Sequence, residues 1–241
     1  APIAGSSILF PGAGMDGASL YGLIDGERAT ALLGVPTVWL GLLNYIESIG
    51  GNLDTVESVV IGGSAAPRSM MEKFTEVYNV FPIHAWGMTE MSPMGSLCSM
   101  TPYLKSADKE GRMRIQAKQG RTVFGVEMRI VDDNDKPLPH DGKTFGKLMV
   151  RGAWVASGYY KSDDNSAFRD GWFDTGDVST IDSMGYMQIV DRSKDVIKSG
   201  GEWISSIELE NFAVGHSSVA EACVVGIAHP KWDERPLLLV V

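Results

Sequence analysis

The segment that most constrains the fold is the β-branched run from Val56 to Ile61, which ends in the glycine pair Gly62-Gly63. A run of this kind is typical of a strand buried in a parallel sheet, and the glycines indicate a tight loop at its carboxyl end. Pro67 can occupy the first position of the helix that we expect to follow, to about Tyr78. Strand, glycine loop and helix in this order predict an α/β architecture for this part of the chain.

The neighbouring segments extend that pattern. We expect residues 16–33 to be mostly helical, and the spacing of Leu40, Leu43 and Ile46 predicts a second helix over residues 37–49. An apolar run over residues 80–83 predicts another strand.

The character of the sequence changes at residues 105–118, a polar stretch that we expect to be a mobile surface segment. From Gly125 onward short strands alternate with turns, which predicts a β-rich subdomain, either a barrel or a sandwich. Ser205 and Glu208 match a capping box and predict the start of a helix, and residues 222–227 read as a strand. The whole chain is therefore expected to be mixed α/β.

Charge and composition exclude several partners. The formal net charge of −9 disfavours nucleic acid, so we expect no nucleic-acid partner. No apolar run reaches the roughly 18 residues of a membrane span, so we expect no stable membrane insertion. The two cysteines, Cys98 and Cys223, give no disulfide or zinc spacing and fit a reducing, cytoplasmic location. The chain lacks an initiator Met and ends in an apolar run, so both ends are expected to be cut.

A candidate diol site comes from Asp177, at the end of Asp170-Gly-Trp-Phe-Asp-Thr-Gly-Asp177, and Arg192, fifteen residues later. A carboxylate can accept hydrogen bonds from two adjacent hydroxyls, and a guanidinium donates in a planar fork. A ribose presents such a diol, so the pair predicts nucleotide binding. The alternative is a turn carboxylate paired with a surface arginine, which would carry no function.

Two loops at expected strand ends are further candidates. Glycines in Gly62-Gly-Ser-Ala-Ala-Pro67 would let the backbone approach a flat ligand, although a tight turn without a ligand has the same pattern. In the next loop Trp86 could stack on a purine, Thr89 could contact a phosphate and Glu90 could bind Mg²⁺. The alternatives are a core tryptophan and a helix-capping threonine.

A third group lies in Lys194 and Lys198-Ser-Gly-Gly-Glu202, where the paired glycines indicate a positive-φ turn or an ordinary hairpin.

Taken together, these motifs resemble those of the adenylate-forming superfamily, which contains acyl-CoA synthetases, non-ribosomal peptide adenylation domains and beetle luciferases. The resemblance covers nearly the whole chain and is strongest to ligases that act on medium-chain fatty acids and on 3-methylmercaptopropionate. The matching segments are, in order, Gly62–Pro67, Ala85–Glu90, Gly146–Gly152 with Gly158-Tyr-Tyr160, Asp170–Asp177 and Asp191–Gly201.

The resemblance implies a two-step reaction. A carboxylate attacks the α-phosphate of ATP to give an acyl-adenylate and pyrophosphate, and the thiol of CoA then displaces AMP. By this resemblance, Asp177 and Arg192 hold the ribose, Trp86 stacks on adenine, Thr89 contacts the phosphate, and Glu90 binds Mg²⁺.

The remaining implied roles rest on the same resemblance. Lys194 matches the hinge of the small domain, Gly201 the glycine of the pantetheine tunnel, and Lys198 belongs to that catalytic turn. Gly62 and Met88 are candidates for the pocket of a small carboxylic acid. The remaining cofactor-binding candidates, around the adenine, are Gly63, Ser64, Ala65, Ala66, Ala85 and Gly87.

In domain terms the resemblance implies the second α/β half of a large domain (1–105), a β-rich subdomain (106–192), and a hinge with the start of a small α+β domain (193–241). The family's phosphate loop and its C-terminal catalytic lysine are not matched in this sequence. We therefore expect the 241 residues alone to form adenylate poorly.

Two rival functions stay open from the sequence. The acyl group could pass to a carrier-protein thiol in place of CoA, or the chain could be a non-catalytic nucleotide-binding module. The oligomeric state is also open, with a homodimer as one possibility.

Overall fold

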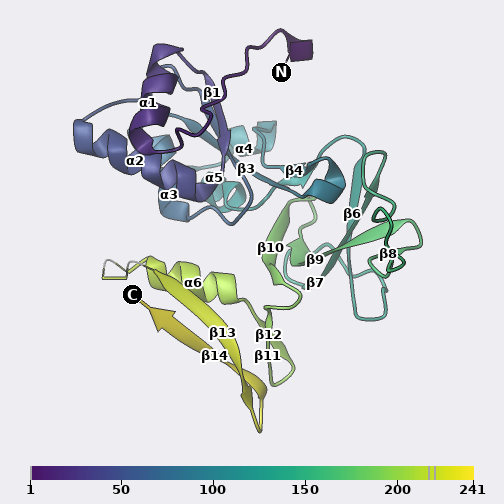
Figure 1. Cartoon of the computed structure of the whole chain (residues 1–241). Coiled ribbons are helices and arrows are strands. Elements are labelled where there is room, and N and C mark those ends of the chain that lie inside the picture. Colours follow the sequence, from purple (N-terminus) through teal and green to yellow (C-terminus); the bar gives the residue numbers. More distant parts are fainter. Residues whose placement is uncertain (1, 217, 220) are drawn as a thin grey trace. The chain divides into compact units, whose positions relative to one another are not determined.

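The computed structural model describes residues 2–216, 218–219 and 221–241 (Figure 1). The chain separates into two compact units, Ala1–Ala85 and Trp86–Val241. Helices and strands occur in both units, which confirms the predicted mixed α/β class. Among the described residues, every helix is too short or too polar to cross a bilayer.

The first unit is built on parallel strands, β1 next to β2 and β2 next to β3. This arrangement confirms the α/β interpretation of the first part of the sequence. The elements are a 3₁₀ turn (Pro2–Ala4), α1 (Gly17–Gly26), β1 (Ala31–Gly34), α2 (Pro36–Ile49), β2 (Ser58–Ile61), α3 (Arg68–Glu72), a π-helical turn (Lys73–Val77) and β3 (Phe81–Gly87).

Helix α2 shows how the sequence sets the first core. Pro36 opens the helix and Gly50 closes it in a left-handed conformation (φ 64°). The buried face is formed by Trp39, Leu42, Leu43 and Ile46, which repeat at helical spacing. The predicted helix is confirmed, although Leu40 lies on its exposed side.

The predicted helix over residues 16–33 is wrong at its end. Asp16 caps α1 by accepting a hydrogen bond from the Ser19 backbone N–H (2.9 Å), but the helix ends at Gly26. Residues 31–34 instead form β1, because they pair in parallel with β2. Sheet pairing between distant segments overrides the local helical pattern here.

The second unit contains two antiparallel sheets besides the short pair β4–β5. One sheet has the order β10-β9-β7-β6, with β8 paired to β9, and the other has the order β12-β11-β14-β13 (Figure 1). Along the described chain the elements are a 3₁₀ turn (Thr89–Met91), β4 (Met94–Leu97), α4 (Pro102–Ser106), α5 (Lys109–Gln116), β5 (Arg121–Thr122), β6 (Val126–Val131), β7 (Gly146–Gly152), β8 (Phe168–Arg169), β9 (Trp172–Ile181), β10 (Met187–Arg192), β11 (Ile197–Ser199), β12 (Glu202–Ile204), α6 (Ser206–Val214), β13 (Ala222–His229) and β14 (Asp233–Val240).

The β-rich region predicted from Gly125 onward is confirmed as strands, but the sheet is open, with β10 and β6 at its ends. It is therefore neither the barrel nor the sandwich that the strand pattern suggested. One face packs into a core of fully or nearly fully buried residues, namely Met91, Val126, Ile130, Leu148, Val150, Phe173, Ile181 and Met187.

Residues 105–118, expected to be a mobile surface segment, are mostly helical and carry buried side chains. Helices α4 and α5 cover most of this segment, and each has a side-chain cap, from Thr101 (3.1 Å to the Leu104 N–H) and Asp108 (2.7 Å to the Gly111 N–H). Leu104, like Met113 and Ile115, is buried. Caps and a few apolar anchors order a segment whose average composition is polar.

The helix predicted from Ser205 is confirmed as α6, since the Ser205 hydroxyl accepts a hydrogen bond from the Glu208 N–H (3.1 Å). Asp191 also stabilises this helix start, because its buried carboxylate accepts from the Ser206 N–H (2.7 Å). The end of β10 is thereby tied to the first turn of α6.

Candidate functional site

Asp177 lies where the ladder between β7 and β9 is interrupted. Lys147 pairs with Val178, but Met149 pairs with Asp174, so residues 175–177 of β9 face only Leu148 of β7. Such a bulge bends a strand and redirects its side chains, and bulges are common beside active sites. Gly176 supplies the left-handed conformation that this turn of the backbone requires (φ 72°).

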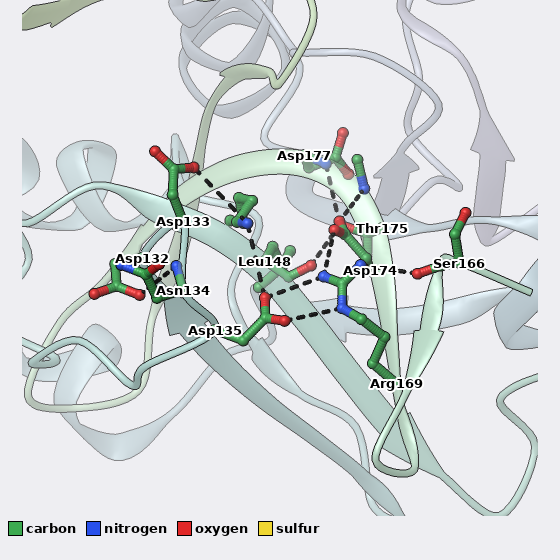
Figure 2. A network of polar contacts seen from close by, with 12 residues as sticks. Asp132, Asp133, Asn134, Asp135, Leu148, Ser166, Arg169, Asp174, Thr175 and Asp177 are labelled. Carbon is green, nitrogen blue, oxygen red and sulfur yellow. Dashed lines mark hydrogen bonds and ion pairs between the residues drawn. The ribbon is translucent and has the colours of Figure 1, made fainter.

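Side chains replace the hydrogen bonds that the bulge removes (Figure 2). The Thr175 hydroxyl donates to the carbonyl of Leu148 (2.9 Å) and accepts from the Asp177 N–H (3.2 Å). The Asp174 carboxylate accepts from the Gly176 N–H (3.0 Å). The backbone that carries Asp177 is therefore fixed by the two residues before the glycine.

Arg169 extends this network to a second turn of the sheet, as Figure 2 shows. Its guanidinium donates to both oxygens of Asp135 (2.9 and 3.1 Å) and to Oδ2 of Asp174 (3.2 Å). The guanidinium of Arg169 holds the pKa of the Asp135 carboxyl below its usual range, chiefly through these hydrogen bonds.

The carboxylate of Asp177 is nearly fully covered and has two partners. Its Oδ1 lies 3.0 Å from Nη1 of Arg192, which stands directly opposite on β10, and its Oδ2 accepts from Nε1 of Trp86 (2.9 Å). The side chain of Asp177 is 4% exposed and that of Arg192 is 54% exposed. Burial raises the pKa of Asp177, and the charge of Arg192 and the Trp86 hydrogen bond offset that rise only in part.

This geometry brings three of the predicted site residues together. Asp177 and Arg192 do form a pair, as the rival interpretation of the sequence also allowed, but the carboxylate is buried where an ordinary surface pair would be exposed. Each carboxylate oxygen of Asp177 thus has one partner and a second lone-pair position. The ring of Trp86 is half-buried and packs against the core of the sheet.

The turn after β3 carries the next predicted residues. Gly87 admits no side chain, because a Cβ there would lie 1.9 Å from the carbonyl oxygen of Pro93. Met88 packs against the sheet core, Thr89 is exposed, and Glu90 is half-buried. Glu90 accepts a hydrogen bond from the hydroxyl of Tyr159 (2.8 Å).

The first unit holds the glycine loop, which connects β2 to α3 as predicted. Gly63 has a positive φ of 84°, and Gly62 donates its N–H to the carbonyl of Gly34 (3.1 Å). The predicted residues of this unit differ in their exposure to solvent. Gly63 and Ser64 are exposed, and Gly62 and Ala65 are half-buried. Ala66 and Ala85 are buried.

The turn that contains Lys194, Lys198, Gly200 and Gly201 is more exposed than the buried carboxylate of Asp177. Lys194 and Gly201 are exposed, and Lys198 lies on β11 with its Nζ 5.3 Å from the ring of Trp203. Gly200 and Gly201 both have positive φ, as predicted, and form the hairpin between β11 and β12.

Sequence reasoning missed the residues that support the site. Thr175 stood inside the Thr-Gly-Asp motif without an assigned role, because its two contacts depend on the register between β7 and β9. Tyr159 was part of a quoted motif, but its contact with Glu90 spans 69 residues and leaves no local signal. Within the described part of the chain, no group of three or more His, Cys, Asp or Glu side chains could hold a metal ion.

Comparison with known proteins gives a consistent result. Residues 2–160 match the family model described as AMP-binding enzyme, and residues 208–241 match the AMP-binding enzyme C-terminal domain. The chain is 51% identical, over 99% of its length, to 3-methylmercaptopropionyl-CoA ligase of Ruegeria lacuscaerulensis, and covers 44% of that protein. It is 47% identical over its whole length to medium-chain-fatty-acid–CoA ligase of Ectopseudomonas oleovorans, again covering 44%.

The fold has solved counterparts. The o-succinylbenzoate CoA synthetase of Bacillus subtilis matches 92% of this chain with a TM-score of 0.77, both in complex with its acyl-adenylate (27% identity, 43% of that chain) and with ATP and magnesium ion (25% identity, 44% of that chain). The chain thus spans less than half the length of the relatives that it matches.

Proposed function

Because this chain belongs to the family of AMP-binding enzymes, we propose that it is part of an ATP-dependent acyl-CoA ligase that activates a short- or medium-chain carboxylic acid. The ligases most similar in the comparison act, by their names, on 3-methylmercaptopropionate and on medium-chain fatty acids. The acid 3-methylmercaptopropionate is therefore the first substrate to test.

The observation that carries the proposal is the buried Asp177 carboxylate between Trp86 and Arg192. The Asp177 carboxylate, fixed on the bulge, can accept hydrogen bonds from the two hydroxyls of a ribose. The long, exposed side chain of Arg192 lies across the strand pair, and its guanidinium can turn toward the ligand.

In the proposed reaction a carboxylate oxygen attacks the α-phosphorus of ATP, which forms the acyl-adenylate and releases pyrophosphate. The thiol of CoA then attacks the acyl carbonyl carbon, which forms the thioester and releases AMP. Asp177 and Arg192 orient the nucleoside through its ribose, Trp86 stacks on the adenine, and Thr89 contacts the phosphate.

Glu90 is the residue that we propose to hold Mg²⁺. A site with a single carboxylate fits this ion, because Mg²⁺ keeps several waters and is often bound by one or two carboxylates together with substrate phosphates. When bound, the ion would neutralise phosphate charge. The half-buried position of Glu90 leaves part of its side chain accessible to such a ligand.

The remaining assignments follow the same proposal. We infer that Gly63, Ser64, Ala65, Ala66, Ala85 and Gly87 contribute to nucleotide binding around the adenine, and that Gly62 and Met88 contribute to the acid pocket. Lys194 acts as the hinge, and Lys198 and Gly201 serve the CoA half-reaction. We infer domains 1–105, 106–192 and 193–241, the last supported by the separate sheet of β11–β14 and the family match from residue 208.

Location and assembly complete the proposal. A cytoplasmic site of action is what we expect of a ligase that uses ATP and CoA. A homodimer stays a prediction, which the molar mass in solution tests directly.

Binding of stable acyl-adenylate mimics tests the function of this chain. We expect acyl-sulfamoyl adenosines with short and medium acyl groups to bind more tightly than adenosine itself, with affinity falling again for a sixteen-carbon chain. Equal affinity for all mimics and for adenosine would show that the acyl group makes no contact, and would contradict the ligase proposal while leaving nucleoside binding intact.

A second measurement addresses the acceptor. CoA should receive the acyl group from a supplied acyl-adenylate faster than a phosphopantetheinylated carrier protein does. The reverse preference would replace the proposed ligase by a carrier-loading enzyme.

A further inference from the structure

Tyr159 contacts the proposed metal ligand directly. Its hydroxyl donates to Oε1 of Glu90 (2.8 Å), from the segment that connects β7 to β8. The same segment binds the backbone of Glu90, since the Ala156 N–H donates to the Glu90 carbonyl (2.7 Å). Both the side chain and the backbone of Glu90 are therefore fixed from one side.

The phenol ring is anchored behind its hydroxyl. Tyr159 meets Phe168 edge-on, with ring centroids 5.4 Å apart, and Phe168 stacks on the buried ring of Phe173 at 4.9 Å. This row of three rings connects the hydroxyl to the core of the β6–β10 sheet. Aromatic pairs of this geometry favour one ring orientation, so the hydroxyl has a defined position.

The loop is also tied to the turn after Glu90. The Ser92 hydroxyl donates to the carbonyl of Trp154 (3.1 Å), two residues before Ala156. These contacts join the segments 89–92 and 154–159, which are far apart in the sequence.

We propose that Tyr159 is a positioning residue for the Glu90 carboxylate: it occupies Oε1 and so presents Oε2 to the metal ion. The inference rests on the proposed role of Glu90 as the Mg²⁺ ligand. Carboxylates that bind metals are commonly oriented by a hydrogen-bond donor in this way, and loss of that donor weakens metal binding. A hydrogen bond to a charged carboxylate is also stronger than one between neutral groups.

The chain offers a matched control in the adjacent residue. Tyr160 is 89% exposed, and its ring lies near the Lys161 ammonium (5.3 Å). Tyr159→Phe and Tyr160→Phe delete the same hydroxyl from neighbouring positions, and both keep the ring.

The test uses the full chain with Mn²⁺ and ATP, following free Mn²⁺ by its EPR signal. We expect Tyr159→Phe to weaken Mn²⁺ binding about tenfold, Tyr160→Phe to leave it unchanged, and Glu90→Gln to weaken it at least as much as Tyr159→Phe. The affinity for AMP without metal should be the same in Tyr159→Phe as in the unmodified chain.

The possible failures are distinguishable. Weak Mn²⁺ binding in Glu90→Gln alone would overturn the role of Tyr159 and leave the metal role of Glu90 intact. Unchanged Mn²⁺ binding in both variants would overturn the metal role and the inference with it. Tighter Mn²⁺ binding in Tyr159→Phe would also overturn the inference, because Tyr159 would then compete with the metal ion. A loss of metal-free AMP affinity as large as the loss of Mn²⁺ affinity would overturn it too, because Tyr159 would then act on the fold in general.

Discussion

The carboxylate site around Asp177 and the turn that contains Lys194 and Lys198 are built in different ways. Asp177 is buried, and the hydroxyl of Thr175 and the indole N–H of Trp86 fix it in place. Lys194 and Lys198 are exposed. The comparison teaches that the carboxylate has a position set by its neighbours, whereas the two lysines are exposed to solvent.

The largest effect should come from removing the buried carboxylate. Asp177→Ala leaves the Trp86 N–H and the Arg192 guanidinium without their acceptor, and adenosine binding should weaken by about 2–3 kcal/mol, measured by titration calorimetry. Asp195→Ala, in the exposed turn, is the control and should bind normally. Equal losses in the two variants would remove the distinction between the regions.

The bulge should contribute to stability through Thr175. In Thr175→Val the Leu148 carbonyl and the Asp177 N–H lose their partner in a buried setting, so the free energy of unfolding should fall by about 1–2 kcal/mol, measured by urea denaturation. Thr175→Ser keeps the hydroxyl and should lose less. If serine proved no better than valine, the hydrogen bonds would not be what closes the bulge.

Adenosine affinity should depend on pH through Asp177. Burial raises the pKa of this carboxyl, so the charged, diol-accepting form is lost as pH falls through a value above the ordinary 3.9 or so. Affinity should therefore be highest near neutral pH and fall as the buffer is acidified toward that pKa. Adenosine carries no phosphate that titrates there, and Asp177→Asn should give a weaker, flat profile; a sloping profile in that variant would assign the titration to another group.

Arg169 should have a small effect. Its side chain and that of Asp135 are each 37% exposed, so solvent screens their pairing. Arg169→Gln should lower the free energy of unfolding by about 0.5 kcal/mol, again from urea denaturation. A loss several times larger would mean that the network to Asp174 is essential for the bulge.

The smallest effect is expected in the exposed turn. Lys198→Ala should leave adenosine affinity unchanged and alter the free energy of unfolding by less than about 0.5 kcal/mol. A clear loss of adenosine affinity would show that the turn belongs to the nucleoside site.

Local patterns predicted the elements whose causes are local. The helix over residues 37–49 was evident from its apolar spacing, and the start of α6 from Ser205 and Glu208. Residues 31–34 were misjudged because their strand is defined by pairing with β2, about 27 residues away in sequence. The helices within the polar segment at 105–118 were missed because its average composition concealed two caps.

The candidate site likewise has residues that the sequence identified and features that depend on contacts between distant segments. Asp177, Arg192 and Trp86 were named from motif and resemblance, and the structure brings them into contact. The depth of Asp177 and the bulge beneath it could not be predicted, because both depend on the shifted register between β7 and β9. The contact from Tyr159 to Glu90 is likewise set by the packing of three rings and not by sequence spacing.

Discrimination between adenosine and its 2′-deoxy and 3′-deoxy forms tests most directly whether the bulge carboxylate binds a sugar diol. We predict that the unmodified chain binds adenosine about tenfold more tightly than either deoxynucleoside, as the loss of one charge-assisted hydrogen bond implies, and that Asp177→Ala abolishes the difference. Equal affinity of the unmodified chain for all three nucleosides would contradict the assignment.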